Sequence, residues 1–172
     1  MDFFEIITTI SSIILLLAAV AISLITYHSQ KIHNRNSVKP LLNIIFGDYE
    51  YDIHIKTQNN GVGPAIIKEI LCSNNKDKTN SLIELIPNEF QIKNHGIVKL
   101  QNFVDFVENI EERVIAPNKE IIIIKYEPEY DSELVAIRTI LKDISIKIRY
   151  VDIYQKEQPV RFRDCSWFGR TL

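Results

Sequence analysis

The first 30 residues contain no lysine or arginine, although the chain of 172 residues has 20 of them. Residues 6–27 lack charged side chains of either sign. A helix of that length rises ~1.5 Å per residue and spans roughly the ~30 Å apolar interior of a bilayer. The sequence therefore predicts a transmembrane anchor over residues 1–27.

A cleaved signal peptide is the first alternative to an anchor. Signal peptides begin with basic residues, whereas this chain begins with the acids Asp2 and Glu5. The run Ala19-Val20-Ala21 resembles a cleavage site, but the apolar stretch continues beyond it to Tyr27. These features favour an uncleaved anchor, and they leave open a cleaved signal or a helix buried in a soluble core.

The positions of the charges and cysteines predict where the domain lies. Because every Lys and Arg follows the apolar run, the positive-inside rule places the N-terminus outside and the C-terminal domain in the cytoplasm, on the inner (plasma) membrane. The chain has only two cysteines, Cys72 and Cys165, and no Asn-x-Ser/Thr sequon. Both facts fit a reducing cytosol, in which we expect free thiols.

One side of the anchor carries small residues at spacings of four and seven: Thr8, Ser12, Ala19 and Ser23. Small residues let helices approach closely in lipid, and hydroxyl groups can form hydrogen bonds between them. This face is the candidate for self-association. The alternative is that an anchor simply tolerates these residue types.

Residues 28–40 are polar and predict a juxtamembrane linker, and residues 41–172 predict one folded domain. Residues 28–172 carry 20 basic and 20 acidic side chains, because Asp2 and Glu5 precede the anchor. A general nucleic-acid binder normally has a basic surplus, so general nucleic-acid binding is not expected.

The domain reads as mainly β. Residues 49–57 alternate strictly, which predicts a strand with Tyr49, Tyr51, Ile53 and Ile55 facing inward. Further strands are expected at 41–46, 65–71, 81–86, 121–124, 144–150 and 160–168, and amphipathic helices at 98–112 and 132–142. Asp131 is expected to cap the second helix. The predicted fold is therefore an α+β, β-sandwich-like domain with two inserted helices.

Several short segments carry a resemblance. A single anchor is followed by Val38-Lys39-Pro40, then by the turn Asn59-Asn60-Gly61-Val62-Gly63-Pro64-Ala65, and late in the chain by Tyr150-Val151-Asp152-Ile153-Tyr154. In this order they resemble a loose group of small bacterial single-pass membrane proteins with a β-sandwich-like soluble domain. The resemblance implies a fold and a membrane attachment, and no reaction.

No catalytic signature is present. The glycine turn lacks the Lys-Ser/Thr of a P-loop, and no Gly-x-Ser-x-Gly or His-Glu-x-x-His motif occurs. None of the four histidines, His28, His33, His54 and His95, has a metal-ligand spacing to another His or Cys. We expect no cofactor, no metal and no enzymatic activity. An enzyme with a scattered site at Cys72 or Cys165 stays open.

The last two expected strands carry four alternating cations: Lys147, Arg149, Arg161 and Arg163. If the hairpin register placed all four on one face, they would form an anion site, and Trp167 or Tyr150 could stack a base. The alternative is a solvated face balanced by Asp152 and Asp164.

These observations lead to two hypotheses. The first is a membrane-anchored, non-enzymatic interaction or sensor module that binds a protein partner or copies of itself. The alternative is a membrane effector gated by an anionic small molecule or nucleotide bound at the C-terminal basic hairpin.

Overall fold

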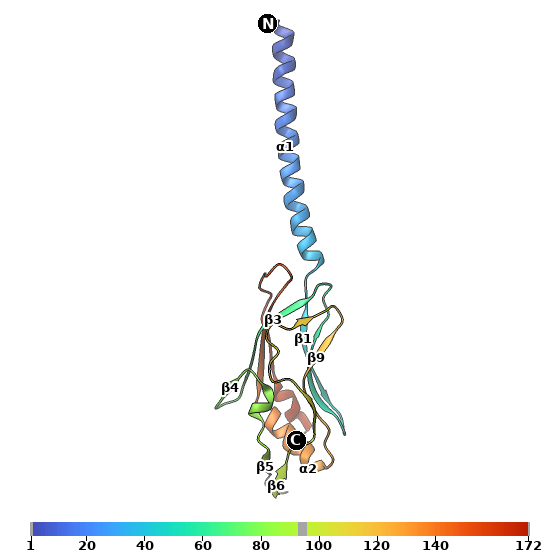
Figure 1. Ribbon diagram of the computed structural model, residues 1–172, viewed down its shortest axis with the longest axis vertical. Helices are drawn as coiled ribbons and strands as arrows, with labels where there is room; N and C mark the ends of the chain where they lie inside the picture. The colour runs from blue at the N-terminus through green and yellow to red at the C-terminus, as the bar shows by residue number, and fades with distance from the viewer. Residues whose placement is uncertain (1, 93–95, 172) are drawn as a thin grey trace. The chain divides into compact units, whose positions relative to one another are not determined.

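The computed structural model describes residues 2–92 and 96–171, and the chain divides into two units, residues 1–37 and 38–172. The first unit is the helix α1 (Phe3–Ser37), in which no described residue is buried (Figure 1). It is long and apolar enough to cross a membrane. The alternative of a helix buried in a soluble core does not match α1, because none of its described residues is buried. The helix continues to Ser37, so most of the segment predicted as a linker is helical.

The second unit combines antiparallel sheets with helical segments, so the predicted mixed α+β class is confirmed. Sheet A has the strand order β1 (Leu42–Asp48), β2 (Ile53–Asn59), β9 (Glu120–Tyr126), β7 (Phe103–Phe106). Sheet B has the order β11 (Arg161–Asp164), β10 (Ser145–Val151), β3 (Ala65–Ser73), β4 (Lys78–Thr79), and β8 (Val114–Ile115) also pairs with β3. The remaining elements are the hairpin β5 (Glu89–Ile92) and β6 (Gly96–Lys99), the 3-10 helices η1 (Leu82–Leu85) and η2 (Cys165–Thr171), and the helix α2 (Asp131–Leu141).

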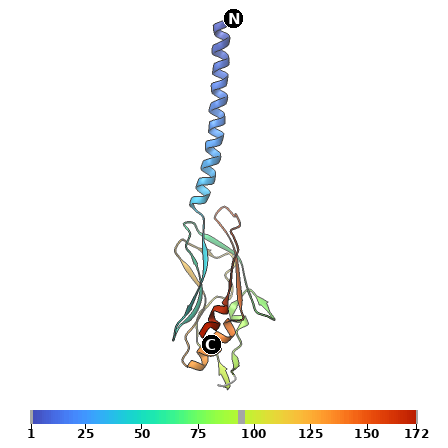
Figure 2. The same ribbon diagram turned by 180° about the vertical axis from the view of Figure 1, so that it is seen from behind.

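Both sheets contribute to one hydrophobic core. Ile55 of sheet A, Ile67 and Ile146 of sheet B, Ile137 of α2 and Phe168 of η2 are all fully or almost fully buried in it. In Figures 1 and 2, α2 and η2 lie together at one end of the domain. The helical segments therefore fill that end of the core.

The alternating segment at 49–57 is a strand only in its second half. Ile53 and Ile55 are buried as expected, whereas Tyr49 and Tyr51 are 64% and 68% exposed. Residues 49–52 form the turn between β1 and β2, and the Tyr49 N–H donates to the Asp52 carbonyl. The prediction that both tyrosines face inward is wrong, because the alternation continues across a turn.

The helix expected at 98–112 does not form, whereas the helix expected at 132–142 is confirmed as α2. Phe103–Phe106 instead pairs with β9, and the Phe103 ring packs against Tyr126 with ring centroids 4.9 Å apart. Pairing with a distant strand outweighs the local helical period here. Asp131 does not cap α2, because the N-cap is Tyr130 and makes no side-chain cap hydrogen bond.

The side chain of Asn59 lies where the chain passes from sheet A to sheet B. Its Oδ1 accepts hydrogen bonds from the backbone N–H groups of Leu41 and Gly61, at 3.1 and 3.0 Å. Its Nδ2 donates to the carbonyls of Gly63 and Ile115, at 2.7 and 2.9 Å. Asn59 is fully buried, and the two oxygen and two nitrogen hydrogen-bonding positions of its amide are all used.

The two glycines of this turn allow a close backbone approach. A Cβ on Gly63 would lie 1.7 Å from the Val38 carbonyl oxygen, and one on Gly61 would lie 2.4 Å from the Leu41 nitrogen. The turn at 59–64 therefore packs directly on the connecting segment 38–41. This explains the glycines of the segment that carried the resemblance.

We expect Asn59→Ala to lower the free energy of unfolding by about 2–4 kcal/mol, because it removes buried hydrogen bonds and leaves their partners unpaired. Unfolding of the full chain in detergent by denaturant, followed by fluorescence of the single tryptophan, Trp167, measures this. The matched control is the exposed neighbour, Asn60→Ala, for which a change within about 0.5 kcal/mol is expected. Equal stability of both variants would contradict the role of Asn59.

Candidate functional site

The register of β10 and β11 separates the four cations of the predicted basic hairpin. Arg163 pairs with Ile146, Arg161 pairs with Ile148, and Phe162 pairs with Lys147. Directly paired residues of an antiparallel ladder point to the same face. Arg161 and Arg163 therefore share the inward face of the buried isoleucines, and Lys147 and Arg149 occupy the other face. The expected face of four cations does not form.

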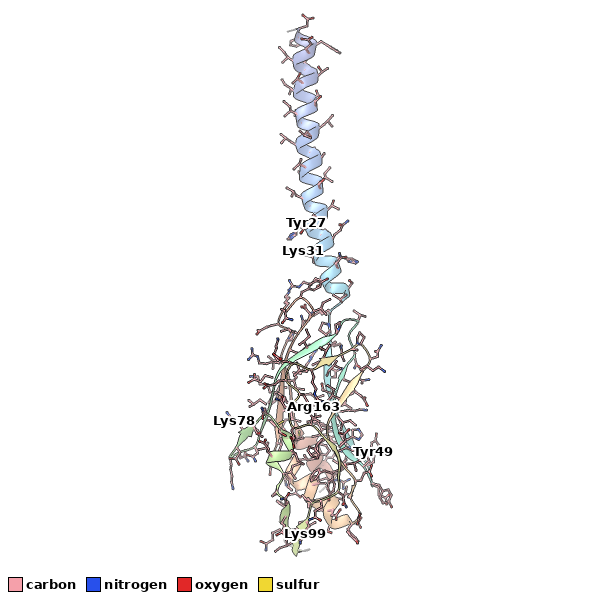
Figure 3. All side chains as sticks on the ribbon, in the orientation of Figure 1. Tyr27, Lys31, Tyr49, Lys78, Lys99 and Arg163 are labelled. Atoms are coloured by element: carbon pink, nitrogen blue, oxygen red, sulfur yellow. The ribbon has the colours of Figure 1, made fainter. Side chains whose placement is uncertain are left out.

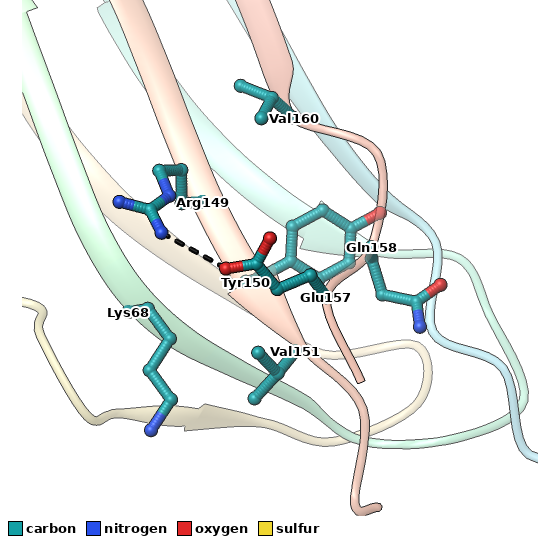
Figure 4. Close-up of a pocket in the computed structure, with 7 residues that line it drawn as sticks. All are labelled: Lys68, Arg149, Tyr150, Val151, Glu157, Gln158 and Val160. Carbon is teal, nitrogen blue, oxygen red and sulfur yellow. Dashed lines mark hydrogen bonds and ion pairs between the residues drawn. The ribbon is translucent and has the colours of Figure 1, made fainter. Parts of the chain in front are cut away.

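Arg149 forms two ion pairs with nearby glutamates. Its guanidinium lies 3.2 Å from a Glu69 oxygen and 3.1 Å from a Glu157 oxygen, and Figure 4 shows the contact with Glu157. The hydrogen bonds that Arg149 donates to Glu157 and, to a lesser extent, to Glu69 raise the pKa of Arg149. The adjoining pocket, with Lys68 and Gln158, holds only about 20 Å³, roughly the space of one water. This pocket has no room for a ligand larger than a water molecule.

Arg161 and Arg163 line a groove between the outermost strands of the two sheets. The groove holds about 330 Å³, and its walls are Asn43, Ile44 and Ile45 of β1 and Arg161, Phe162 and Arg163 of β11. This volume falls at the lower end of the range for ligand sites. The groove contains two guanidinium groups and no carboxylate among its lining residues. Figure 3 shows Arg163 in the middle of the domain.

The two arginines are held differently. Arg163 donates to the Ile44 carbonyl and lies over the Phe46 ring, with its guanidinium carbon 4.2 Å from the ring centroid. Arg161 is partly buried, and its Nε is a buried nitrogen without a hydrogen-bond partner. A buried donor without a partner is costly. An anion in the groove would supply the missing acceptor for Arg161.

The residues expected to assist or neutralise this site have other roles. Tyr150 is buried, and Trp167 packs on Phe46 and Phe168, so neither is free to stack a base. Asp152 accepts hydrogen bonds within its own loop, from Tyr154 and Lys156. Asp164 accepts from Ser166, and this bond lowers the pKa of its carboxyl. The exposed aromatic side chain of β11 is instead Phe162, which is 65% exposed.

A larger depression has the opposite chemistry. It holds about 530 Å³ and is lined by residues that include Tyr51, Phe103, Glu127 and Glu129. Its two carboxylates make it unsuited to an anion. Nearby, the buried Glu133 accepts from the Tyr126 hydroxyl at 3.0 Å and from the Glu129 N–H at 3.0 Å. Burial, and then this hydrogen bond, raise the pKa of Tyr126, so the pair is a satisfied structural contact.

The four small residues of the predicted association face lie exposed on one side of α1. Their hydroxyl groups bond within the helix: Thr8 to the Phe4 and Glu5 carbonyls, Ser12 to the Thr8 carbonyl and Ser23 to the Ala19 carbonyl. Each is satisfied without a second helix. Self-association through Thr8, Ser12, Ala19 and Ser23 stays a prediction.

The described histidines lie on separate elements or on the exposed surface of α1. His28 and His33 are exposed on α1, and His54 contacts Asp52 with 3.1 Å between Nδ1 and Oδ1. His95 lies outside the described residues. Among residues 2–92 and 96–171, no group of three or more His, Cys, Asp or Glu side chains is placed to hold a metal ion.

Cys72 and Cys165 are free and fully buried. Cys72 pairs with Ile146 of β10, and the Cys165 N–H donates to the carbonyl of Ile144, the residue just before the same strand, so the cysteines lie on opposite sides of β10. Two strand spacings of ~4.8 Å exceed the ~7 Å limit for a disulfide between Cα atoms. Burial raises the pKa of both thiols to about 12, which leaves almost no thiolate at neutral pH.

Sequence reasoning found half of the groove and missed the other half. Arg161 and Arg163 were candidates, whereas Asn43, Ile44 and Ile45 were not. The register of β10 with β11 would have identified the inward pair. Because Ile146 faces the core, Arg163, which pairs directly with it, must point to the same face. Inward-pointing charges on a short strand are typical of the edge of a sheet, which is where β11 lies.

No protein-family model matches the chain, and neither a curated protein nor a solved structure matches it. The interpretation of the groove as a binding site therefore depends on its geometry alone.

We expect both thiols to resist alkylation in the folded protein at pH 8 and to react fully after denaturation. Because folding raises the thiol pKa, the folded state holds these protons, so the free energy of unfolding falls as pH rises from 9.0 toward about 12. Mass spectrometry after iodoacetamide treatment, with and without denaturant, measures the labelling. Fast labelling of either residue in the folded chain would reopen the cysteine-centred enzyme.

Proposed function

We propose that the chain is a single-pass anchored, non-enzymatic binding module of the inner membrane, with its N-terminus outside and a sandwich-like domain in the cytoplasm. The support is the uncharged stretch of α1 and the restriction of every Lys and Arg to positions after it. Lys31 and Arg35 lie on the last turns of the helix, where phospholipid headgroups would attract them.

The attachment predicts two results. The full chain stays in the membrane pellet after alkaline carbonate extraction, because the apolar helix cannot leave the lipid. Protease removes the domain from inside-out vesicles and leaves it intact in sealed right-side-out vesicles. Immunoblotting with an antibody to the domain measures both. Release by carbonate, or digestion from the outer side, would contradict the anchor or the orientation respectively.

The observation that carries the binding proposal is the groove between β1 and β11. It presents two guanidinium groups, no carboxylate in its lining and one buried donor without a partner. Hydrogen bonds from arginine to carboxylate or phosphate are among the strong ones in proteins. The function that this geometry supports best is capture of an anionic group of a partner molecule.

The four cations of the hairpin supply a matched pair of variants. Arg161→Ala removes one of the two inward guanidinium groups, and Lys147→Ala removes a cation of the same hairpin on the opposite face. We expect Arg161→Ala to weaken partner capture by about tenfold or more, because a charged hydrogen bond is worth about 1.5–3 kcal/mol. Lys147→Ala should leave it unchanged. Arg161 is preferred to Arg163, which also bonds to Ile44.

Cross-linking in native membranes, followed by quantitative mass spectrometry of the proteins recovered with each variant, measures this difference. Proteins recovered with the wild-type chain and with Lys147→Ala, and depleted with Arg161→Ala, are the expected partners. Equal recovery with all three chains would remove the groove as the binding site.

A second candidate function is an effector gated by a nucleotide. The observation that favours it is the exposed Phe162 ring, which lies between the two arginines in sequence and also lines the groove. An aromatic ring can stack a base, and arginines can hold phosphates. The register weakens this reading, because Phe162 points to the opposite face of the strand from Arg161 and Arg163.

A further inference from the structure

The groove lies at a seam where the edges of the two sheets meet. β1 ends the strand order of sheet A, and β11 ends that of sheet B. The two strands lie alongside each other, and Arg163 of β11 donates to the Ile44 carbonyl of β1 across the seam. In the described sheets neither strand is paired with the other. The seam is too narrow for a further strand, but its volume of about 330 Å³ can hold a compact group.

The register of β1 shows which of its backbone groups face the seam. The Asn60 N–H donates to the Leu41 carbonyl, and this pair continues the register of β1 with β2. Hydrogen-bonded and non-hydrogen-bonded pairs alternate along an antiparallel ladder, so the even-numbered residues of β1 point their backbone groups away from β2. Ile44 is one of these residues. Because its carbonyl accepts from Arg163, its N–H is the group that it offers to a ligand in the seam.

The other wall of the seam, β11, also presents donors. The Cys165 N–H donates to the Ile144 carbonyl, and this pair continues the register of β10 with β11. By the same alternation, Arg161 and Arg163 point their backbone groups toward β10. The N–H of Phe162, which lies between them, points to the seam. Both arginines line the groove as well, so a ligand there meets donors from two strands.

The charges around the groove favour an anion with more than one negative charge. Two arginines and no acidic residue are among its lining residues. The nearest acid in the sequence, Asp164, lies on the opposite face of β11 and accepts a hydrogen bond from the Ser166 N–H. The Nε of Arg161 is buried without a partner. One bound group would therefore neutralise two cations and supply the missing acceptor.

The positions of the donors distinguish between classes of anion. A carboxylate has two oxygens in one plane, which suit the fork of a single guanidinium group. A phosphate monoester carries about 1.5 to 2 negative charges at neutral pH and has three acceptor oxygens. Because these oxygens diverge, a phosphate can accept from β1 and from β11 at once. Phosphate therefore matches the two cations in charge and the two walls in geometry.

We propose that the groove is a phosphate-binding site, in which one phosphate monoester lies between β1 and β11 and accepts from Arg161, from Arg163 and from the Ile44 N–H. This inference rests on the proposed function and names the chemistry of the captured group. A phosphorylated side chain of a partner protein and a small phosphate ester both carry this group. The groove recognises the phosphate itself, and the experiment identifies its carrier.

Isothermal titration calorimetry on the full chain, in maltoside micelles and phosphate-free buffer, tests the proposal. The probes are inorganic phosphate, adenosine monophosphate and two short acetylated, amidated peptides that differ only in a phosphoserine or a glutamate. We expect the phosphoserine peptide to bind about tenfold or more tightly than the glutamate peptide, because phosphate has the greater charge and one more acceptor oxygen. Whichever of the phosphopeptide and the nucleotide binds more tightly than inorganic phosphate identifies the carrier.

Three comparisons of variants locate the phosphate. Arg161→Ala should weaken binding of the phosphate probes by about tenfold or more, whereas Lys147→Ala, on the opposite face, should leave it unchanged. Arg161→Lys keeps the charge but loses the Nε–H, so it should bind about threefold or more weakly than the wild-type chain. Asn43→Asp and Asn43→Ala lose the same amide from the β1 wall, but only the first adds a carboxylate. It should bind about tenfold or more weakly than the second.

Trp167 fluorescence during thermal unfolding reports whether each variant folds. If a variant does not fold, the comparison of the two peptides on the wild-type chain decides alone.

The outcomes separate this inference from the proposed function. Equal binding of both peptides, still weakened by Arg161→Ala, overturns the preference for phosphate and leaves an anion-binding groove. Equal binding by Asn43→Asp and Asn43→Ala overturns the position of the phosphate between the two strands. Absence of binding by every probe, while cross-linking in membranes still depends on Arg161, overturns the phosphate site alone. If Arg161→Ala changes neither the binding of these probes nor the cross-linking, both proposals are wrong.

Discussion

The two sheets depend on one buried amide for the way the chain passes between them. Asn59 ends β2 of sheet A, and its side chain binds the segment before β1, the turn before β3 and the end of β8. The turn, the connecting segment and the second sheet are therefore fixed together. The β1 edge, which forms one wall of the groove, starts directly after this junction. Its position relative to β11 follows from where Asn59 holds Leu41.

The elements that the sequence predicted correctly are those whose local pattern and tertiary environment agree. α2 has an apolar stripe that faces the core, and the isoleucines of β9 and β10 occupy the interiors of their sheets. The segment 98–112 has an equally regular helical period, yet Phe103–Phe106 within it forms a strand that pairs with β9. Local periodicity carries no information about a strand far away in the sequence. Here pairing with β9 outweighs the helical pattern.

The candidate site shows the same limit at the level of single residues. Alternation correctly placed Arg161 with Arg163 and Lys147 with Arg149, because side chains of a strand alternate by geometry alone. It could not say which pair faces inward, since that depends on the pairing of β10 with β11. The strand expected at 41–46 forms as β1, but alternation could not place it beside β11, because the two lie more than a hundred residues apart in the sequence and meet only in the folded domain.

The attachment of β1 has a mechanical consequence. This strand follows directly from the connecting segment at 38–41, so force applied through that segment reaches β1 before any other strand. A pull along the strand loads its hydrogen bonds with β2 in parallel, and they must break together, whereas a perpendicular pull would open them one by one. The Asn59 junction sits at the loaded end of this ladder. A pull along β1 would therefore meet more resistance than a pull across it.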